Sequence, residues 1–228
     1  ITIDDAYAIQ QYITKKRLES GQKIVGRKIG LTSKVMQDLF NVNEPDYGTI
    51  FEDLVYPNRC VIKKDKMIQA RVEAEIAFIL KQDLLGPNIT ALQVLQATEG
   101  VMPCLEIIDS RIENYSIKIQ DTIADNASCW GVVLGSKLSY PLGIDYSVLG
   151  VTAYKNGEVV ATATGAAVLG NPLNSVAWLA NKMLEYGVVL KAGDIVISGS
   201  LIGAFPIDKG DVVQANFDRI GEVSVIIG

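Results

Sequence analysis

Histidine is absent from this chain of 228 residues, and its absence excludes several kinds of active site. Without an imidazole there is no Ser-His-Asp triad, no Cys-His nucleophile pair and no zinc site with histidine ligands. Any acid–base chemistry must therefore use Asp, Glu, Lys, Tyr or Cys side chains.

Cysteine is scarce, with only Cys60, Cys104 and Cys129 in the chain. The odd number and the lack of a CxxC pair predict reduced thiols in a cytoplasmic protein. Because no histidine can activate them, we interpret the three cysteines as packing residues.

Long apolar runs and basic clusters are also missing. No stretch approaches the roughly 18 apolar residues of a membrane span, and no signal peptide is visible. The net charge is −5, and the one basic run, Lys63–Lys66, is interrupted by an acid. Since phosphate binding needs a concentrated basic surface, we expect neither nucleic acid nor membrane as a partner.

The patterns along the chain predict many strands and a few helices. Hydrophobic residues make up 49% of the sequence, enough for a sizeable core. Helices are expected over residues 3–20, 33–40, 90–99 and 172–186, and strands over 23–31, 71–80, 101–108 and 129–135. Asn156-Gly157 predicts a hairpin, and further strands follow residue 193. This order predicts one α+β domain over residues 1–228, with a mostly antiparallel sheet.

The stretch RVEAEIAFIL, residues 71–80, places Glu73 and Glu75 on one face of an apolar strand. The Cα atoms of these two residues would lie roughly 6.5–7 Å apart. Glu106 occupies a second apolar strand, and the three carboxylates can converge if the two strands are neighbours. Ligation by oxygen alone suits Mg²⁺ or Mn²⁺. The alternative is a strand with one solvated face.

Lys28 lies in another apolar strand, just before Gly30-Leu31-Thr32. A desolvated lysine has a lowered pKa and can serve as an acid, a base or a Schiff-base nucleophile. The alternative is a lysine at a sheet edge whose ammonium reaches water.

The stretch Asn43–Asn58 contains Pro45, Gly48 and Pro57, which predicts a long loop or lid. Asp46 in this stretch is either an acid–base residue on a lid or a turn residue. The run Asp125-Asn126-Ala127-Ser128 either caps a helix or lines a pocket.

Seven segments occur in an order that is similar to one known family: KIGLTSKVMQ, EPDYG, RVEAEIAFIL, PCLEIIDSRI, QDTIADNAS, AWLANKM and ISGS. Together they resemble the 2-keto-4-pentenoate hydratase (2-hydroxypenta-2,4-dienoate hydratase) group of the fumarylacetoacetate hydrolase superfamily. The resemblance implies a β-rich roll, a curved mixed sheet flanked by helices. It also implies a family N-terminal segment of some thirty residues upstream of Ile1.

The resemblance assigns roles to the residues already singled out. It implies a divalent metal, Mg²⁺ or Mn²⁺, held by Glu73, Glu75 and Glu106. Lys28 and Asp46 would carry the proton transfers, and Ser128 would contact the substrate.

The implied reaction is the addition of water to 2-hydroxypenta-2,4-dienoate in the meta-cleavage breakdown of aromatic compounds. The main alternatives are a 4-oxalocrotonate decarboxylase of the same superfamily and a hydratase for a longer or diacid homologue. A metal-free Schiff-base enzyme and a non-catalytic partner subunit are further alternatives. The His–Glu water activator of acylpyruvate hydrolases cannot be built in a chain without histidine. A homo-oligomer is expected, as is association with a decarboxylase partner.

Overall fold

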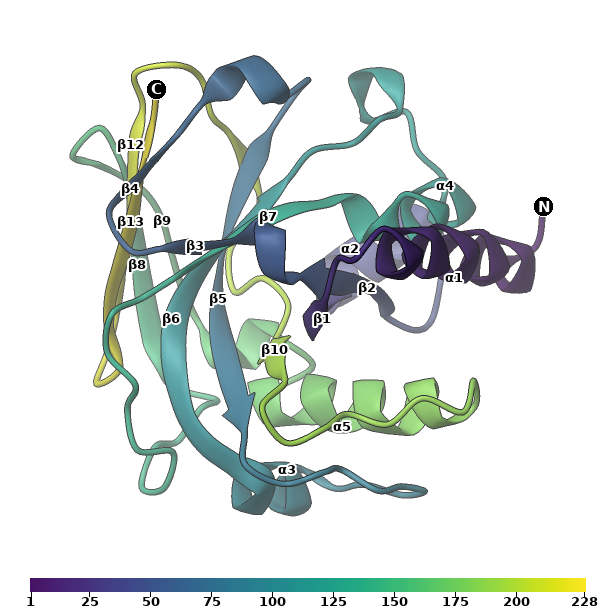
Figure 1. Ribbon diagram of the computed structural model, residues 1–228. Coiled ribbons are helices and arrows are strands. Elements are labelled where there is room, and N and C mark those ends of the chain that lie inside the picture. Colours follow the sequence, from purple (N-terminus) through teal and green to yellow (C-terminus); the bar gives the residue numbers. More distant parts are fainter.

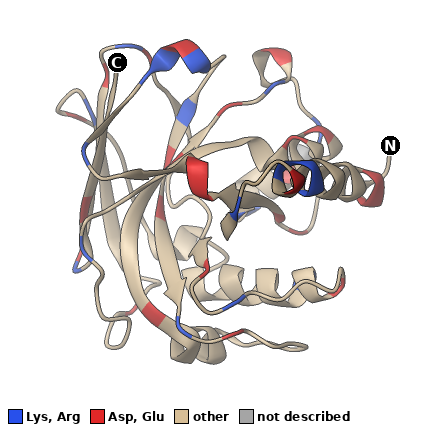
Figure 2. Cartoon of the chain, viewed as in Figure 1, with Lys and Arg blue, Asp and Glu red and all other residues tan. Residues whose placement is uncertain are grey.

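The computed structural model describes the backbone of residues 1–228 and all side chains except those of Leu39 and Phe40. Two β-sheets enclose the main apolar core, and α1 and α5 lie on the far side of the larger sheet from the smaller one (Figure 1). In Figure 2, Lys and Arg residues are dispersed over several elements with Asp and Glu between them. No helix in the described part of the chain is both long and apolar enough to span a bilayer.

The larger sheet has the order β2-β1-β10-β5-β6-β7-β3, with β11 paired to β5. Its strands are β1 Ile24–Gly30, β2 Asp46–Phe51, β3 Val55–Pro57, β5 Arg71–Leu80, β6 Thr98–Ile108, β7 Cys129–Leu134, β10 Ile195–Ile197 and β11 Phe205–Pro206. The β1–β10 and β3–β7 pairs are parallel and the others are antiparallel, so the sheet is mixed.

The smaller sheet has the order β4-β13-β12-β8-β9. Its strands are β4 Cys60–Ile62, β8 Gly150–Lys155, β9 Glu158–Thr164, β12 Val212–Phe217 and β13 Gly221–Ile227. The predicted hairpin is confirmed, because β8 and β9 pair across Asn156 and Gly157. Both turn residues have positive φ, 55° and 85°, as a type I′ turn requires.

The helices are α1 Ile3–Glu19, α2 Lys34–Phe40, α3 Ala91–Ala97, α4 Ile119–Ala124 and α5 Pro172–Leu184. Single 3₁₀ turns are η1 Glu52–Leu54, η2 Lys64–Lys66, η3 Glu113–Tyr115, η4 Asn126–Ser128 and η5 Gly165–Ala167. Thr2 and Asp5 form a capping box at the start of α1, and Ser33 caps α2. Strand β6 starts at Thr98, three residues earlier than predicted, because α3 ends at Ala97.

The long strands β5 and β6 run through the middle of the molecule (Figure 1). Val72, Ala74, Ile76 and Phe78 of β5 are buried in the core shared with the smaller sheet. The other face of β5 therefore carries its two glutamates away from that core.

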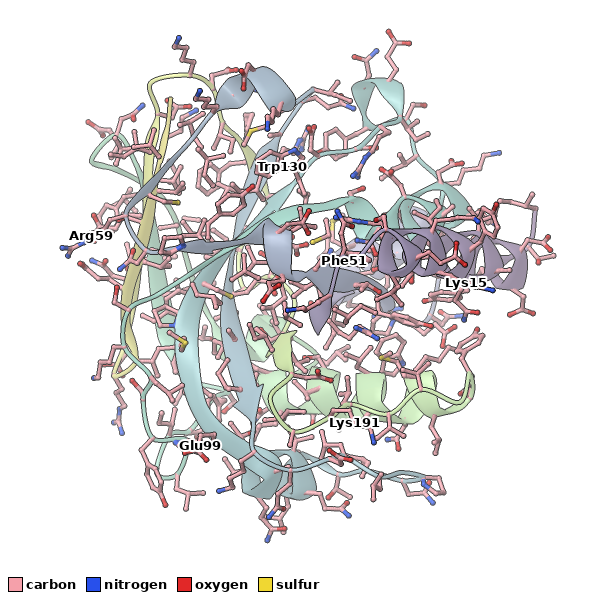
Figure 3. The ribbon with its side chains drawn as sticks, viewed as in Figure 1. Lys15, Phe51, Arg59, Glu99, Trp130 and Lys191 are labelled. Carbon is pink, nitrogen blue, oxygen red and sulfur yellow. The ribbon has the colours of Figure 1, made fainter. Side chains whose placement is uncertain are left out.

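The stretch Asn43–Asn58 is not the predicted loop or lid, because it contains β2, η1 and β3. Every residue of β2 is buried, and the strand pairs antiparallel with β1. Phe51, at its end, lies inside the molecule, whereas Lys15, Arg59 and Lys191 extend from the surface (Figure 3). Glycine at position 48 permits close packing, since a Cβ there would lie 2.5 Å from the carbonyl oxygen of Asn126.

Candidate active site

Three carboxylates converge where β5 and β6 lie side by side. Glu73 and Glu106 are directly opposite each other in the antiparallel register, and Glu75 follows on the same face of β5. One carboxylate oxygen from each residue lies within 4.8 Å of the other two. The alternative of a solvated face is wrong, since Glu75 and Glu106 are both 0% exposed.

The carboxylate oxygens have few partners in the protein. Gly199 N donates to Glu75 Oε2 at 2.8 Å. Within the described part of the chain, Oε1 of Glu75 and Oε1 of Glu106 accept no hydrogen bond. Buried anionic oxygens without donors are costly, and a hard divalent cation would satisfy them. The donor set therefore fits a Mg²⁺-type ion.

The electrostatics of the three carboxylates lead to the same conclusion. Burial raises the pKa of Glu73 to about 7, and the nearby Glu106 carboxylate adds to this rise. Burial, then Glu106 and Glu73, raises the pKa of Glu75 well above its ordinary value. Burial also raises the pKa of Glu106, although Lys28 opposes the rise. Three like charges at this separation require a cation or protons to coexist.

Lys28 lies on β1, an interior strand between β2 and β10, and is 3% exposed. The sheet-edge alternative for this lysine is therefore wrong. Its Nζ donates to Ala127 O at 2.9 Å and lies 3.2 Å from Glu106 Oε2. Burial lowers the pKa of Lys28, but the charges of Glu106 and Asp46 outweigh it, so the net pKa is raised. The expectation of a lowered pKa is wrong because it considered burial without these carboxylates.

Asp46 begins β2 opposite Gly30 and is 1% exposed, so it lies neither on a lid nor in a turn. A Cβ at position 30 would collide with Asp46 Oδ1 and lie 3.5 Å from Lys28 Nζ. Gly30 thus makes room for the carboxyl group beside the lysine. Burial raises the pKa of Asp46 above its ordinary value, and the charge of Lys28 opposes the rise.

The turn η4 supplies groups whose roles are not evident in the sequence. Asn126, Ala127 and Ser128 have φ values of 57°, 51° and 56°, an unusual left-handed run for residues other than glycine. Asn126 Oδ1 accepts from Thr49 N at 2.7 Å and its Nδ2 donates to Thr49 O at 2.9 Å. Asn126 therefore fixes η4 to β2, while Ala127 O holds Lys28.

Several of these residues line a cavity of about 580 Å³. Lys28, Asp46 and Glu73 line it together with Ser128, whose buried Oγ has no hydrogen-bond partner in the described part of the chain. Of the two readings of the Asp125–Ser128 run, the pocket-lining one applies to Ser128. Much of the remaining wall is apolar and includes Leu31, Val35, Met36, Ile108, Ile117 and Ile202.

Comparison with known proteins identifies the family of the chain. Residues 34–227 match the family model described as fumarylacetoacetate (FAA) hydrolase C-terminal. A 2-hydroxyhexa-2,4-dienoate hydratase of Comamonas testosteroni is 42% identical over 227 residues, 99% of this chain and 86% of that protein. A 2-keto-4-pentenoate hydratase of Paraburkholderia xenovorans (strain LB400) is 44% identical over 98% of this chain and 83% of that protein.

Among solved structures, the 4-oxalocrotonate decarboxylase of Pseudomonas putida G7, complexed with magnesium and adipate, superposes with a TM-score of 0.97. It is 37% identical, and the match covers 100% of this chain and 87% of that one. The expected curved mixed sheet with flanking helices is confirmed by this match. By the extent of the family match and the identity to its relatives, the chain belongs to the fumarylacetoacetate (FAA) hydrolase C-terminal family.

Proposed function

We propose that this protein is a divalent-metal-dependent hydratase that converts 2-hydroxypenta-2,4-dienoate to 4-hydroxy-2-oxopentanoate. The observation that carries the proposal is the cluster of three carboxylates beside Lys28, with Glu73 and Lys28 lining a cavity. The identity of 42% and 44% to two hydratases over nearly the whole chain supports this reaction class.

Glu73, Glu75 and Glu106 are the proposed ligands, and Mg²⁺ or Mn²⁺ is the proposed ion. Magnesium in the related decarboxylase supports this choice, as does a donor set made only of carboxylate oxygens. When bound, the cation would supply Lewis acidity toward the C2 oxygen of a 2-oxo acid.

Lys28 and Asp46 are the proposed proton carriers. The first step moves a proton from the 2-hydroxyl group and adds one at C5, giving 2-oxopent-3-enoate. Water then adds its oxygen at C4 while a proton adds at C3. Asp46 is suited to give up a proton because its pKa is raised by burial, and the Lys28 ammonium stabilises negative charge that develops beside it. Ser128 lines the cavity, and its Oγ, which has no partner among the described residues, is the proposed hydrogen-bonding group for the substrate.

The direct test incubates the protein with 2-hydroxypenta-2,4-dienoate, with and without Mg²⁺, and identifies the product by mass. We expect a Mg²⁺-dependent gain of one water.

The second candidate is 4-oxalocrotonate decarboxylation, favoured by the TM-score of 0.97 to that enzyme. Release of CO₂ from 4-oxalocrotonate, with no hydration of the dienoate, would identify decarboxylation as the reaction of this protein instead.

We also propose that residues 1–228 form one catalytic domain of a cytoplasmic homo-oligomer. Val159 and Val160 support self-association, since they lie on the edge strand β9 and are 59% and 44% exposed. Light scattering by the purified protein tests this point, and a monomeric mass would contradict it. We further propose that the protein associates with a 4-oxalocrotonate decarboxylase. Light scattering of a mixture of the two proteins tests this association, and masses equal to those of the separate proteins would contradict it.

Metal binding should stabilise the fold more strongly at pH 8 than at pH 5.5. The pKa of Glu73 is about 7 in the folded protein against 4.5 ordinarily, so without metal its contribution to stability is lost as the pH rises from 4.5 through 7. A bound cation neutralises the Glu73 charge at high pH, as the proton does below pH 7, and so restores the lost stability. We expect saturating Mg²⁺ to raise the Tm by roughly 5–10 °C at pH 8 and by less at pH 5.5. Thermal melts with EDTA or Mg²⁺ measure both shifts, and equal shifts would contradict the assignment.

Asn126 is expected to position the proton carriers. In Asn126→Ala both bonds to Thr49 are lost, which frees η4 from β2 and loosens the Ala127 carbonyl that holds Lys28. We expect kcat to fall by about 10²-fold, with KM and Mg²⁺ affinity nearly unchanged. Asn174→Ala is the control, because that side chain is exposed and donates to Leu169 O, away from the carboxylate cluster in sequence. A parallel loss of Mg²⁺ binding in Asn126→Ala would indicate general unfolding instead.

A further inference from the structure

Arg71 is a charged residue of the cavity that the proposed chemistry does not use. It is the first residue of β5 and shares its face with Glu73 and Glu75. The Cα atom of Arg71 lies roughly 6.5–7 Å from that of Glu73 along the strand. Lys28 and Arg71 are the only basic residues that line the cavity among the described side chains.

Among the described side chains, the guanidinium of Arg71 is the one that has no protein acceptor. The other five arginines each donate to a side chain or a carbonyl group: Arg17, Arg27, Arg59, Arg111 and Arg219. Arg71 makes no ion pair and no side-chain hydrogen bond within the described part of the chain. Its N–H donors therefore remain available to a ligand.

Tyr115 holds the free guanidinium in place. The Arg71 guanidinium carbon lies 4.7 Å from the centre of the Tyr115 ring, and Tyr115 OH donates to Ile108 O at 3.2 Å. A stacked arginine loses part of its conformational freedom before a ligand arrives. A guanidinium group held in this orientation can donate two parallel hydrogen bonds to a carboxylate.

A second wall of the cavity is uncharged. Val35 and Met36 come from α2, which follows β1, and β10 separates β1 from β5. The other cation, Lys28, is already paired with Glu106 and Ala127 O. A ligand that places one carboxylate at Arg71 meets apolar side chains at α2, where no cation among the cavity-lining residues is available to a second carboxylate.

We propose that Arg71 binds the C1 carboxylate of the substrate and that the α2 wall receives a short uncharged tail. The protein is then a hydratase for monocarboxylic 2-hydroxydienoates and discriminates against dicarboxylic homologues. This inference rests on the proposed function.

The test compares kcat and KM of wild type, Arg71→Gln and Arg71→Lys with Mg²⁺ on three substrates. These are 2-hydroxypenta-2,4-dienoate, its C6 homologue with a terminal methyl group, and 2-hydroxyhepta-2,4-diene-1,7-dioate. We expect wild type to prefer both monoacids by at least about tenfold in kcat/KM. Arg71→Gln should raise KM for both monoacids by about 10- to 100-fold, and Arg71→Lys should recover part of the loss.

Arg59→Gln is the matched control, because Arg59 is exposed, pairs with Glu222 and lies at the opposite side of the molecule from α1 (Figure 3). An unchanged KM for the monoacids in Arg71→Gln overturns the inference. A loss confined to the diacid also overturns it, since Arg71 would then bind a distal carboxylate.

Calorimetric binding of 2-oxopentanoate with Mg²⁺ separates this inference from the proposed function. If wild type hydrates none of the three dienoates, the proposed function fails. Weaker binding of 2-oxopentanoate by Arg71→Gln than by Arg59→Gln then still supports a carboxylate site at Arg71. Equal binding by the two variants overturns that site.

Discussion

Glu106→Gln is expected to abolish divalent-cation binding and to reduce turnover by roughly 10³-fold, the order of loss for a major electrostatic contribution to catalysis. The substitution keeps the shape of a fully buried side chain and removes one of three converging negative charges. The amide also places donors where a cation needs oxygen ligands. Calorimetric titration with Mg²⁺ and the hydration assay measure the two losses.

Glu99→Gln is the matched control for this variant. Glu99 lies on the same strand as Glu106, near its start, and is exposed (Figure 3). The same chemical change there should leave Mg²⁺ affinity and kcat unaltered. If Glu106→Gln bound Mg²⁺ as tightly as wild type, Glu106 would not be a ligand of the metal.

The carboxylate cluster was predictable only in part from the sequence. Glu73 and Glu75 share a face because a strand repeats every two residues, and this holds for any strand. That Glu106 joins them depends on the register in which β5 and β6 pair, with Glu73 opposite Glu106. A shift by one residue would turn Glu106 to the other face, and no local pattern fixes that register.

Asp46 was misplaced by the prediction for a different physical reason. Pro45 and Gly48 are typical of loops, yet Gly48 is required because β2 packs closely against η4. The strand exists through its pairing with β1 and through the two bonds from Asn126 to Thr49. The bonds from Asn126 join residues 77 positions apart, beyond the range of any local signal.

The raised pKa of Lys28 shows the same limit. An apolar strand predicts burial, and burial alone lowers the pKa of a lysine. The charges of Glu106 and Asp46 reverse the shift, and both reach Lys28 only through the sheet. Which charges surround a buried group therefore follows from the fold and not from its neighbours in sequence.

Lys28→Met is expected to reduce kcat by about 10³-fold or more while Mg²⁺ affinity stays within roughly tenfold of wild type. Methionine fills most of the same buried space but supplies neither a proton nor a positive charge. The bound cation, rather than Lys28, would neutralise Glu106, so the metal site should persist. Lys23→Met is the control, since the exposed Lys23 precedes β1 and pairs only with the exposed Glu52.

The same variant separates proton transfer from Schiff-base catalysis. Lys28 Nζ is held by Ala127 O at 2.9 Å and Glu106 Oε2 at 3.2 Å, and both acceptors favour the protonated amine, which is not nucleophilic. We therefore expect no borohydride-trapped adduct with 2-oxopentanoate in wild type. A trapped adduct that disappears in Lys28→Met would establish the covalent route. Full activity of Lys28→Met would exclude both roles and leave Asp46 as the remaining proton carrier.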